Sequence, residues 1–237
     1  MKACDPPGPI AHSAQCVHRT ALFLSYMAYK GMVDGQDHPS AAERVNSIPA
    51  IFQQDWMGGL TLDAGEKRFV NAPFGTLQPY QREEASWLIE GMAVLAWAVQ
   101  AAELPPFHRK VNGAKVSKAL GIFQADAGER IEQATLRNPD EIVMGARTYA
   151  ALLWRLNEFV KDRKPVEFMN RLSDPDGHLI VDGLEFLDGD LAIEGLSLEK
   201  VPDEKLYVVG AIAYERNRRF RWLLGFERGV STVTTVN

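Results

Sequence analysis

The chain has 237 residues and a net charge of −5. Hydrophobic residues make up 46% of it, which excludes a disordered chain and suffices to bury a sizeable core. An acidic chain is repelled by nucleic acid and by anionic membrane surfaces, so either partner would require a local basic patch.

The few cysteines and histidines predict neither a disulfide framework nor a metal site. There are two cysteines, Cys4 and Cys16, and no two of the five histidines have the i, i+4 spacing of a helical zinc site. The sequence also lacks the glycine-rich motifs that bind phosphate. We therefore expect no metal and no cofactor, and the low cysteine count favours a reducing compartment.

The N-terminal region predicts a loose tail followed by helices. Residues 1–10 contain three prolines and an acid, a composition unlike that of a signal peptide. Apolar spacing predicts a helix over 12–30. The capping-box pattern of Ser40 and Glu43 predicts the start of a second helix, which should run to about residue 54. The run ALFLSYMAY is too short to span a bilayer. We expect a cytoplasmic protein with no membrane segment, folded as a single domain over 11–237.

Residues 87–99, WLIEGMAVLAWAV, carry the strongest helical signal in the chain. Every residue except Glu90 and Gly91 is apolar, so apolar side chains surround the whole helix. A helix of this kind is buried on all sides, and its length is too short for a membrane span. The predicted fold is mainly α, a multi-helix bundle around this buried central helix. We expect the helix to be ended by Pro105 and Pro106.

The C-terminal half predicts two further helices separated by a small sheet. Asn138 and Pro139 form a helix start, because asparagine caps the N-terminus and proline suits the first turn. That helix should reach about residue 160. Asp-Gly pairs at 176–177, 182–183 and 188–189 predict tight hairpin turns within an antiparallel β-meander over about 173–198. A last helix is expected from about 202 to about 225.

Glu90 is the first candidate for a functional residue, because a carboxylate in an apolar helix must find a cation, find donors or hold its proton. One interpretation is a buried ion pair with Arg19 or with an arginine of the last helix. The other is a general acid or base with a raised pKa.

The last helix contains the stretch AIAYERNRRFRWLLGF, residues 211–226, with four arginines and one glutamate. Asn217 falls on its main apolar face and Arg216 flanks that face, while Glu215 lies off it. We expect a helix buried on more than one side, with arginines held by fixed partners. A nucleic-acid site would instead need several cations on one exposed face.

Two sets of buried residues are therefore predicted. The buried polar set is Arg19, Glu90, Glu215, Arg216 and Asn217. The aromatic core set is Trp87, Trp97, Trp154 and Trp222.

Several of these segments resemble a known family, the bacterial domain of unknown function family numbered 4272. WLIEGMAVLAWAV at 87–99 is similar to its W-x-x-E-[AG]-x-x-x-L-x-W-A-[LV] segment, and LLWRL at 152–156 to its following helix. DGDLAIEG at 188–195, AYERNRRFRWLLGF at 213–226 and STVTTVN at 231–237 resemble its hairpin, last helix and tail. The resemblance covers most of the chain from about residue 40. It carries over to six positions, Trp87, Glu90, Trp97, Glu215, Arg216 and Trp222.

The chain departs from the family pattern in the last helix. Asn217, Arg219 and Arg221 stand where the pattern has His, Ala and Asn. Asparagine cannot replace a catalytic or metal-binding histidine, so the departure argues against a shared histidine-dependent reaction. The family has no established activity, and the resemblance implies the architecture alone.

Three functions remain open from the sequence. The first is a non-enzymatic module that binds a protein partner, as inhibitor and immunity proteins do. The second is an enzyme that uses Glu90, Glu215 and Arg216, with Arg19, around a polar pocket in the bundle. The third is nucleic-acid binding through the arginine-rich last helix. The absence of a catalytic motif favours the first over the second, and the acidic charge disfavours the third.

Overall fold

A computed structural model describes residues 10–37, 40–60, 62–173 and 180–227. The fold is mainly α, as predicted. In chain order the α-helices and strands are α1 (Ala14–Val33), α2 (Ala41–Ile51), α3 (Ala64–Asn71), α4 (Pro79–Ala98), α5 (Gly113–Leu120), α6 (Ala127–Glu132), α7 (Pro139–Asp162), α8 (Phe168–Arg171), β1 (Glu185–Leu187), β2 (Asp190–Ile193), β3 (Leu196–Ser197) and α9 (Asp203–Leu223). Two short 3₁₀ helices, η1 (Asp55–Met57) and η2 (Leu198–Lys200), complete the set.

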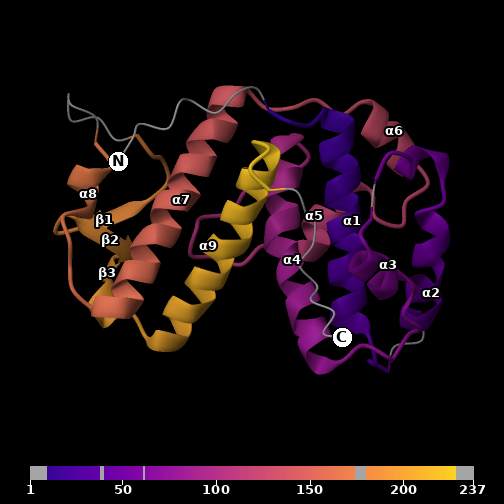
Figure 1. Cartoon of the computed structure of the whole chain (residues 1–237), viewed down its shortest axis with the longest axis horizontal. Helices are drawn as coiled ribbons and strands as arrows, with labels where there is room; N and C mark the ends of the chain where they lie inside the picture. Colours follow the sequence, from indigo (N-terminus) through magenta and orange to yellow (C-terminus); the bar gives the residue numbers. More distant parts are fainter. Residues whose placement is uncertain (1–9, 38–39, 61, 174–179, 228–237) are drawn as a thin grey trace.

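The four longest helices stand side by side in the order α7, α9, α4 and α1 (Figure 1). The small helices α2, α3, α5 and α6 pack on the α1 side, and the sheet with α8 packs on the α7 side (Figure 1). Helix α4 therefore lies between α1 and α9, the position predicted for the helix with apolar residues on all sides.

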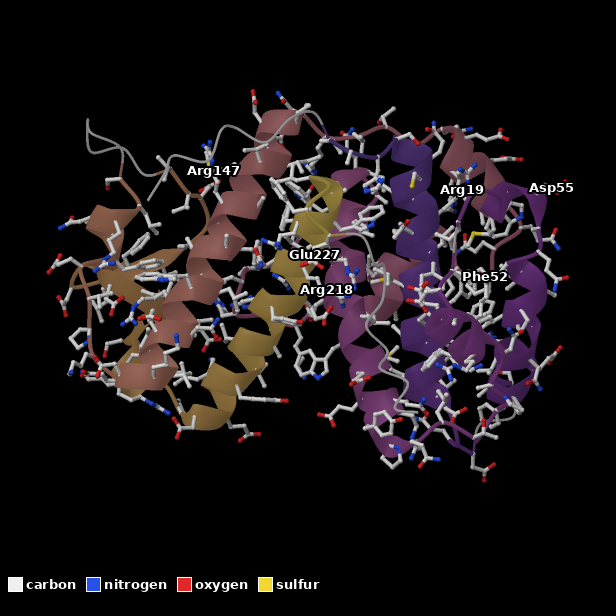
Figure 2. The ribbon with its side chains drawn as sticks, viewed as in Figure 1. Arg19, Phe52, Asp55, Arg147, Arg218 and Glu227 are labelled. Atoms are coloured by element: carbon white, nitrogen blue, oxygen red, sulfur yellow. The ribbon has the colours of Figure 1, made fainter. Side chains whose placement is uncertain are left out.

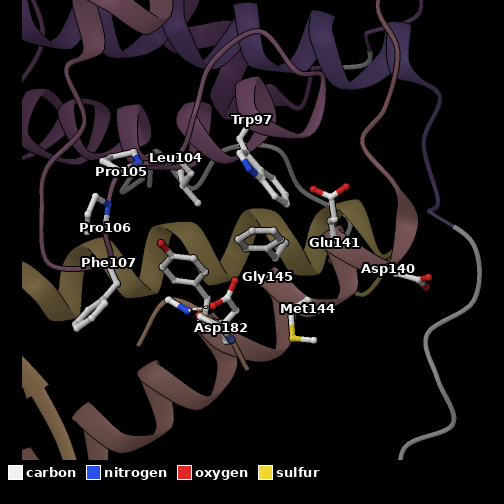
Figure 3. A pocket seen from close by; sticks show the side chains of 14 residues that line it. Trp97, Leu104, Pro105, Pro106, Phe107, Asp140, Glu141, Met144, Gly145 and Asp182 are labelled. Carbon is white, nitrogen blue, oxygen red and sulfur yellow. Dashed lines mark hydrogen bonds between the residues drawn. The ribbon is translucent and has the colours of Figure 1, made fainter. Parts of the chain in front are cut away.

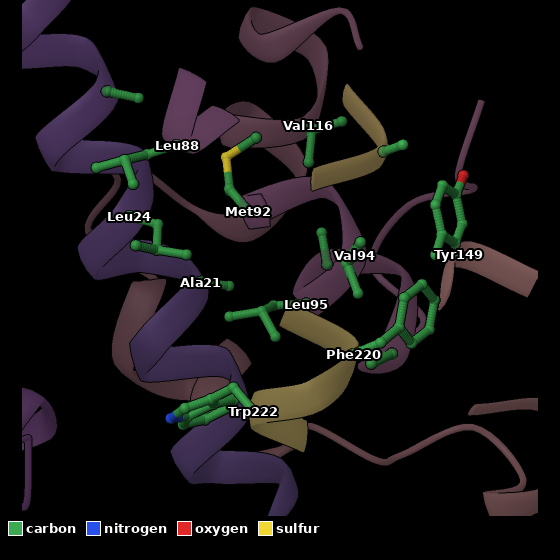
Figure 4. Packing of buried hydrophobic residues seen from close by; sticks show 14 of the residues in the cluster. Ala21, Leu24, Leu88, Met92, Val94, Leu95, Val116, Tyr149, Phe220 and Trp222 are labelled. Atoms are coloured by element: carbon green, nitrogen blue, oxygen red, sulfur yellow. The ribbon is translucent and has the colours of Figure 1, made fainter. Parts of the chain in front are cut away.

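The contact between α1 and α4 depends on small residues. A methyl group at Gly31 would lie 2.5 Å from Cβ of Ala85, so the two backbones approach closely only because one position lacks a side chain. Leu24 of α1 and Leu88 and Met92 of α4 belong to the buried apolar cluster that these helices share (Figure 4).

Helix α4 begins at Pro79, well before the predicted start at residue 87, and ends at Ala98, before the two prolines. Its first turns are polar and therefore carry no apolar periodicity. They are stabilised by a capping box between Gln78 and Gln81 and by a proline in the first turn. The start of α7 is as predicted, since the Asn138 side chain accepts a hydrogen bond from the Asp140 backbone N–H at 3.0 Å.

The predicted β-meander is present as a three-stranded antiparallel sheet in the order β1-β2-β3. Asp188 and Gly189 form the first hairpin turn, and both have positive φ, 51° and 78°. The second turn is Glu194–Gly195, also at positive φ, and not the predicted Asp182–Gly183, which precedes β1. The pair at 176–177 lies outside the described residues.

The four tryptophans predicted for the core differ in how far they are buried. Trp222 is buried and stacks on His12 with ring centroids 3.8 Å apart. Trp97 is half-buried and packs against the core. Trp154 is 39% exposed, so its assignment to the core was wrong: it lies on the outer side of α7, stacked on Phe168. Trp87 is also only half-buried, with Lys110 over its ring.

Candidate functional site

Glu90 of α4 and Arg216 of α9 form an ion pair in the interior of the protein. Both residues are 0% exposed. Nε and Nη2 of Arg216 donate to the same carboxylate oxygen, Oε2 of Glu90, at 3.0 and 2.8 Å. The other oxygen, Oε1, accepts the backbone N–H of Val111 at 2.9 Å. Each charge is therefore both paired and hydrogen-bonded, as a buried pair requires.

The remaining donors of Arg216 are also used. Nη1 donates to the Pro105 carbonyl and to the Tyr149 hydroxyl, each at 2.8 Å, and Nη2 donates to the Arg109 carbonyl at 2.8 Å. A guanidinium has five N–H donors, and these contacts employ all of them. The network fixes the loop between α4 and α5 to helices α4, α7 and α9. Its geometry is that of a structural ion pair without a free donor for a substrate.

Arg19 is not part of this network, which corrects one of the two partners predicted for Glu90. It is half-buried, and its Nε donates to the Trp56 carbonyl at 2.7 Å. Figure 2 shows Arg19 on α1 close to Asp55 of η1, well away from Arg218 on α9. Helix α1 directs this side chain toward η1, so it ties the two elements together.

Glu215 pairs with a different arginine of its own helix. Its Oε2 lies 3.7 Å from Nη2 of Arg219, an i, i+4 contact, and that oxygen has no hydrogen-bond partner among the described residues. Burial raises the pKa of Glu215, opposed by the charges of Arg219 and Arg218. Burial also lowers the pKa of Arg219 to about 10. Glu215 is thus a buried carboxylate near the Glu90 pair but not hydrogen-bonded to it.

Asn217 is half-buried, although its side-chain oxygen is sealed and has no hydrogen-bond partner among the described residues. Of the predicted polar set, the structure therefore unites Glu90 with Arg216. Glu215, Asn217 and Arg19 each stand in separate surroundings.

A second buried ion pair, which sequence reasoning missed, joins α7 to the sheet. Arg155 donates to both oxygens of Asp190 on β2, from Nε at 2.6 Å and from Nη2 at 2.5 Å. Burial alone would raise the pKa of Asp190, but hydrogen bonds from Arg155, Leu191 and Val166 outweigh it and lower the pKa. A signal was present: an arginine within an apolar stretch of α7 and an aspartate directly after the hairpin turn.

Lys30 is a further buried charge, 1% exposed, near the end of α1. Its Nζ donates to the carbonyls of Val70 and Ala72, at 2.8 and 2.6 Å, at the end of α3. Burial lowers the pKa of Lys30 to about 8, opposed by nearby Asp34. Asp34 in turn accepts the backbone N–H groups of Gly75 and Leu77 at 2.7 and 3.0 Å. Both residues hold the segment after α3 against α1.

Two clefts lie on either side of the α7–α9 pair. The first, which we name the Tyr149 cleft, has a volume of about 500 Å³ and lies between α7, the 104–107 loop and the end of α4 (Figure 3). The second, the α7–α9 groove, has a volume of about 630 Å³ and runs over the outer surface of the two helices. Neither Glu90 nor Arg216 lines the Tyr149 cleft, and the cleft meets their network through Tyr149 and the Pro105–Pro106 segment.

Glu90 does line a further cleft of about 500 Å³ on its other side, beside Trp87 and Lys110. Its side chain is nevertheless only 1% exposed, because the carboxylate points inward to Arg216. The described residues contain no group of three or more His, Cys, Asp or Glu arranged to hold a metal ion. In that same part of the chain, no helix has both the length and the apolar character needed to cross a membrane.

The comparisons with known proteins give one family match. No curated protein and no solved structure matches the chain. A family model, Domain of unknown function (DUF4272), matches residues 11–171. The match begins earlier than the resemblance predicted and ends before the sheet, so the similar segments at 188–195, 213–226 and 231–237 lie outside it. Because the match covers more than half of the chain, the protein belongs to the DUF4272 family.

Proposed function

We propose that the protein is a binding module that recognises a protein partner through the α7–α9 groove. The groove is lined by one face of each helix. Its lining residues are Leu153, Leu156, Asn157, Val160, Arg163, Asp203, Leu206, Tyr207, Gly210, Ala211 and Tyr214.

Exposed tyrosines on the rim of this groove carry the proposal. Tyr207 is 65% exposed and Tyr214 is 51% exposed, while Val160 across from them is 63% exposed. Tyr207 and Tyr214 are two turns apart and share one face of α9. Tyrosine is enriched at protein interfaces because it supplies a large apolar ring together with a polar hydroxyl. Apolar side chains exposed together around one groove are characteristic of a recognition surface.

The floor of the groove is suited to an amphipathic helix. A methyl group built at Gly210 meets nothing within 4 Å, so a partner side chain has room to enter between the two tyrosines. From Asp203 to Tyr214 the groove follows about 16 Å of helix α9, the length of three helical turns. A partner helix with apolar residues at i, i+3 or i+4 and i+7 would match this length.

The buried charges favour a binding role over the alternatives. Arg216 is saturated with protein partners, and Glu90 is sealed with it. An enzyme built on Glu90, Glu215 and Arg216 would need a charged group exposed in a substrate cavity, whereas the Glu90 side chain is 1% exposed and its carboxylate is bound by Arg216. Arg216, Arg218 and Arg219 are all buried, whereas a phosphate backbone needs exposed cations. We also propose that the protein acts in the bacterial cytoplasm, in line with its two cysteines.

The test is a comparison of two matched surface variants. The wild-type protein is used to capture partners from a lysate of the organism that makes it, and each captured protein is then purified and titrated by calorimetry. Tyr207→Glu should weaken binding of the true partner at least about tenfold, because it places a charge in the apolar groove. Tyr80→Glu alters a tyrosine that is 41% exposed at the start of α4, and it should leave the affinity unchanged.

Equal affinities of the two variants would reject the groove as the binding surface. Sedimentation of the wild-type protein and of Tyr207→Glu tests whether a second copy of the chain occupies the groove. Self-association that the substitution abolishes would make the groove an interface between two copies of the chain and would replace the proposed partner.

A further inference from the structure

The Tyr149 cleft faces away from the α7–α9 groove, and the partner proposed for the groove does not occupy it. Phe220 lines the cleft and Tyr207 lines the groove. These residues are thirteen positions apart on α9, a rotation of roughly 220° that places them on nearly opposite sides of the helix. A ligand of the cleft would therefore contact a different side of α9 from a partner in the groove.

The inner wall of the cleft is aromatic and closely packed. The Phe220 ring stacks on Tyr149 with centroids 5.4 Å apart and meets Trp97 edge-on at 5.7 Å. Gly145 of α7 makes this arrangement possible, because a methyl group there would lie 2.6 Å from the Phe220 ring. The Tyr149 hydroxyl is held in turn by Arg216. Leu104, Pro105 and Met144 extend the apolar surface (Figure 3).

The charged residues of the cleft have one sign. Among the described residues its lining includes the carboxylates of Asp140, Glu141 and Asp182 and no lysine, arginine or histidine. Asp140 points away from the cleft, whereas Asp182 is turned toward its interior (Figure 3). Glu141 lies 3.4 Å from Arg137, so its charge is partly balanced.

Asp182 is different, because no cation of the described chain pairs with it. Its Oδ1 accepts the Gly183 backbone N–H at 2.7 Å. Its own backbone is fixed by Thr148, whose hydroxyl oxygen accepts the Asp182 N–H at 3.1 Å and donates to the Asp182 carbonyl at 3.2 Å. A carboxylate on a fixed backbone, beside apolar walls, is complementary to a cation attached to an apolar body.

We propose that the Tyr149 cleft binds an organic cation, an ammonium or guanidinium group on an apolar or aromatic body. The cation pairs with Asp182, and the apolar body packs against Trp97, Leu104 and Met144. The cleft volume of about 500 Å³ lies within the range of small-molecule sites, which runs from about 300 to about 1,000 Å³. The same chemistry is present in a free amine and in an arginine side chain of a peptide.

The test uses probes of matched shape and different charge. Benzamidine, benzamide and benzoate are titrated against the full chain and followed by protein NMR and calorimetry. Benzamidine should bind at least about tenfold more tightly than either of the other two, because only it is a cation. A second arm compares benzamidine with N-acetyl-arginine methylamide. Tighter binding of benzamidine assigns the site to a free small-molecule cation, and tighter binding of the arginine derivative assigns it to a peptide side chain.

Substitutions of residues that line the cleft test where the cation binds. Asp182→Asn keeps the oxygen that accepts the Gly183 N–H and removes the charge, so it should weaken benzamidine binding about tenfold without changing the melting temperature. Asp140→Asn removes a charge that points away and should leave binding unchanged. Met144→Trp should fill the cleft and abolish binding of every probe. Equal binding of the three benzene derivatives, no binding of either cation, or an unchanged affinity in Asp182→Asn would overturn the proposal.

Discussion

Arg216 and Glu90 meet through two nitrogens and a single carboxylate oxygen, at 3.0 and 2.8 Å, although they are 126 residues apart in the chain. The pair joins α9 to α4 at the middle of the row of long helices. Because the same guanidinium also holds the loop after α4 and the Tyr149 hydroxyl, its loss would loosen three elements at once.

The first prediction concerns this pair. Arg216→Met should destabilise the protein by about 3–5 kcal/mol, since it leaves the Glu90 carboxylate buried without its cation. Glu90→Gln should also destabilise it, and the double variant should lose less than the sum of the two single losses. Urea unfolding of the four proteins measures the coupling. Strictly additive losses would mean that the two charges do not depend on each other.

The second prediction concerns two glycines with opposite surroundings. A methyl group at Gly91 would lie 2.6 Å from Nε of buried Arg219, whereas one at Gly210 meets nothing within 4 Å. Gly91→Ala should therefore destabilise the protein by about 1–3 kcal/mol through overpacking. Gly210→Ala should stabilise it by up to about 1 kcal/mol, because alanine is the better helix former. Thermal or urea unfolding measures both, and the same sign for both would contradict the packing of α4 against Arg219.

The third prediction concerns Lys30 and alkaline pH. Burial lowers its pKa from 10.5 to about 8, so between these two values the unfolded chain binds a proton that the folded chain has released. The contribution of Lys30 to the free energy of unfolding should therefore increase as pH rises from about 8 to about 10.5. The difference in unfolding free energy between wild type and Lys30→Met should shift in favour of the wild type over this interval. A difference that stays flat would mean that Lys30 titrates alike in both states.

The fourth prediction concerns the pair that holds the sheet. Asp190→Asn should destabilise the protein by about 2–4 kcal/mol at neutral pH, because it leaves the Arg155 guanidinium buried without its anion. The neighbouring variant Asp188→Asn is the control. It changes a turn residue at positive φ, a conformation that asparagine tolerates, and should alter the stability by less than about 0.5 kcal/mol.

Acid should remove the difference between wild type and Asp190→Asn. The folded-state pKa of Asp190 lies below its usual value of 3.8, so its contribution is present above that pH and is lost as pH falls through the folded-state pKa. Amide hydrogen exchange at Leu191 and Val166 follows the same event locally, because both N–H groups donate to the Asp190 carboxylate. Protection that persists in Asp190→Asn would show that the sheet is held by other contacts.

Local signals determined most of the secondary structure. The cap at Asn138, the positive-φ turn at Asp188–Gly189 and the apolar run of 87–99 each specify backbone geometry through residues a few positions apart. Such signals act in the unfolded chain as well as in the native one, so they can be recognised without knowledge of the fold. They fail where the local pattern has two solutions, as at Asp182–Gly183, whose composition suits a hairpin but which lies before the first strand.

The sequence by itself determined that α9 combines four arginines with apolar residues and that Glu90 needs a partner. Only the tertiary structure decided which partner it has. Helical periodicity gives the direction in which Arg216 and Arg19 leave their helices, but not what lies in that direction. That depends on the packing of α4 between α1 and α9, which turns Arg216 toward Glu90 and Arg19 toward η1. The same packing left Trp154 outside the core and opened the two clefts, since the space between helices is set by side chains from distant parts of the chain.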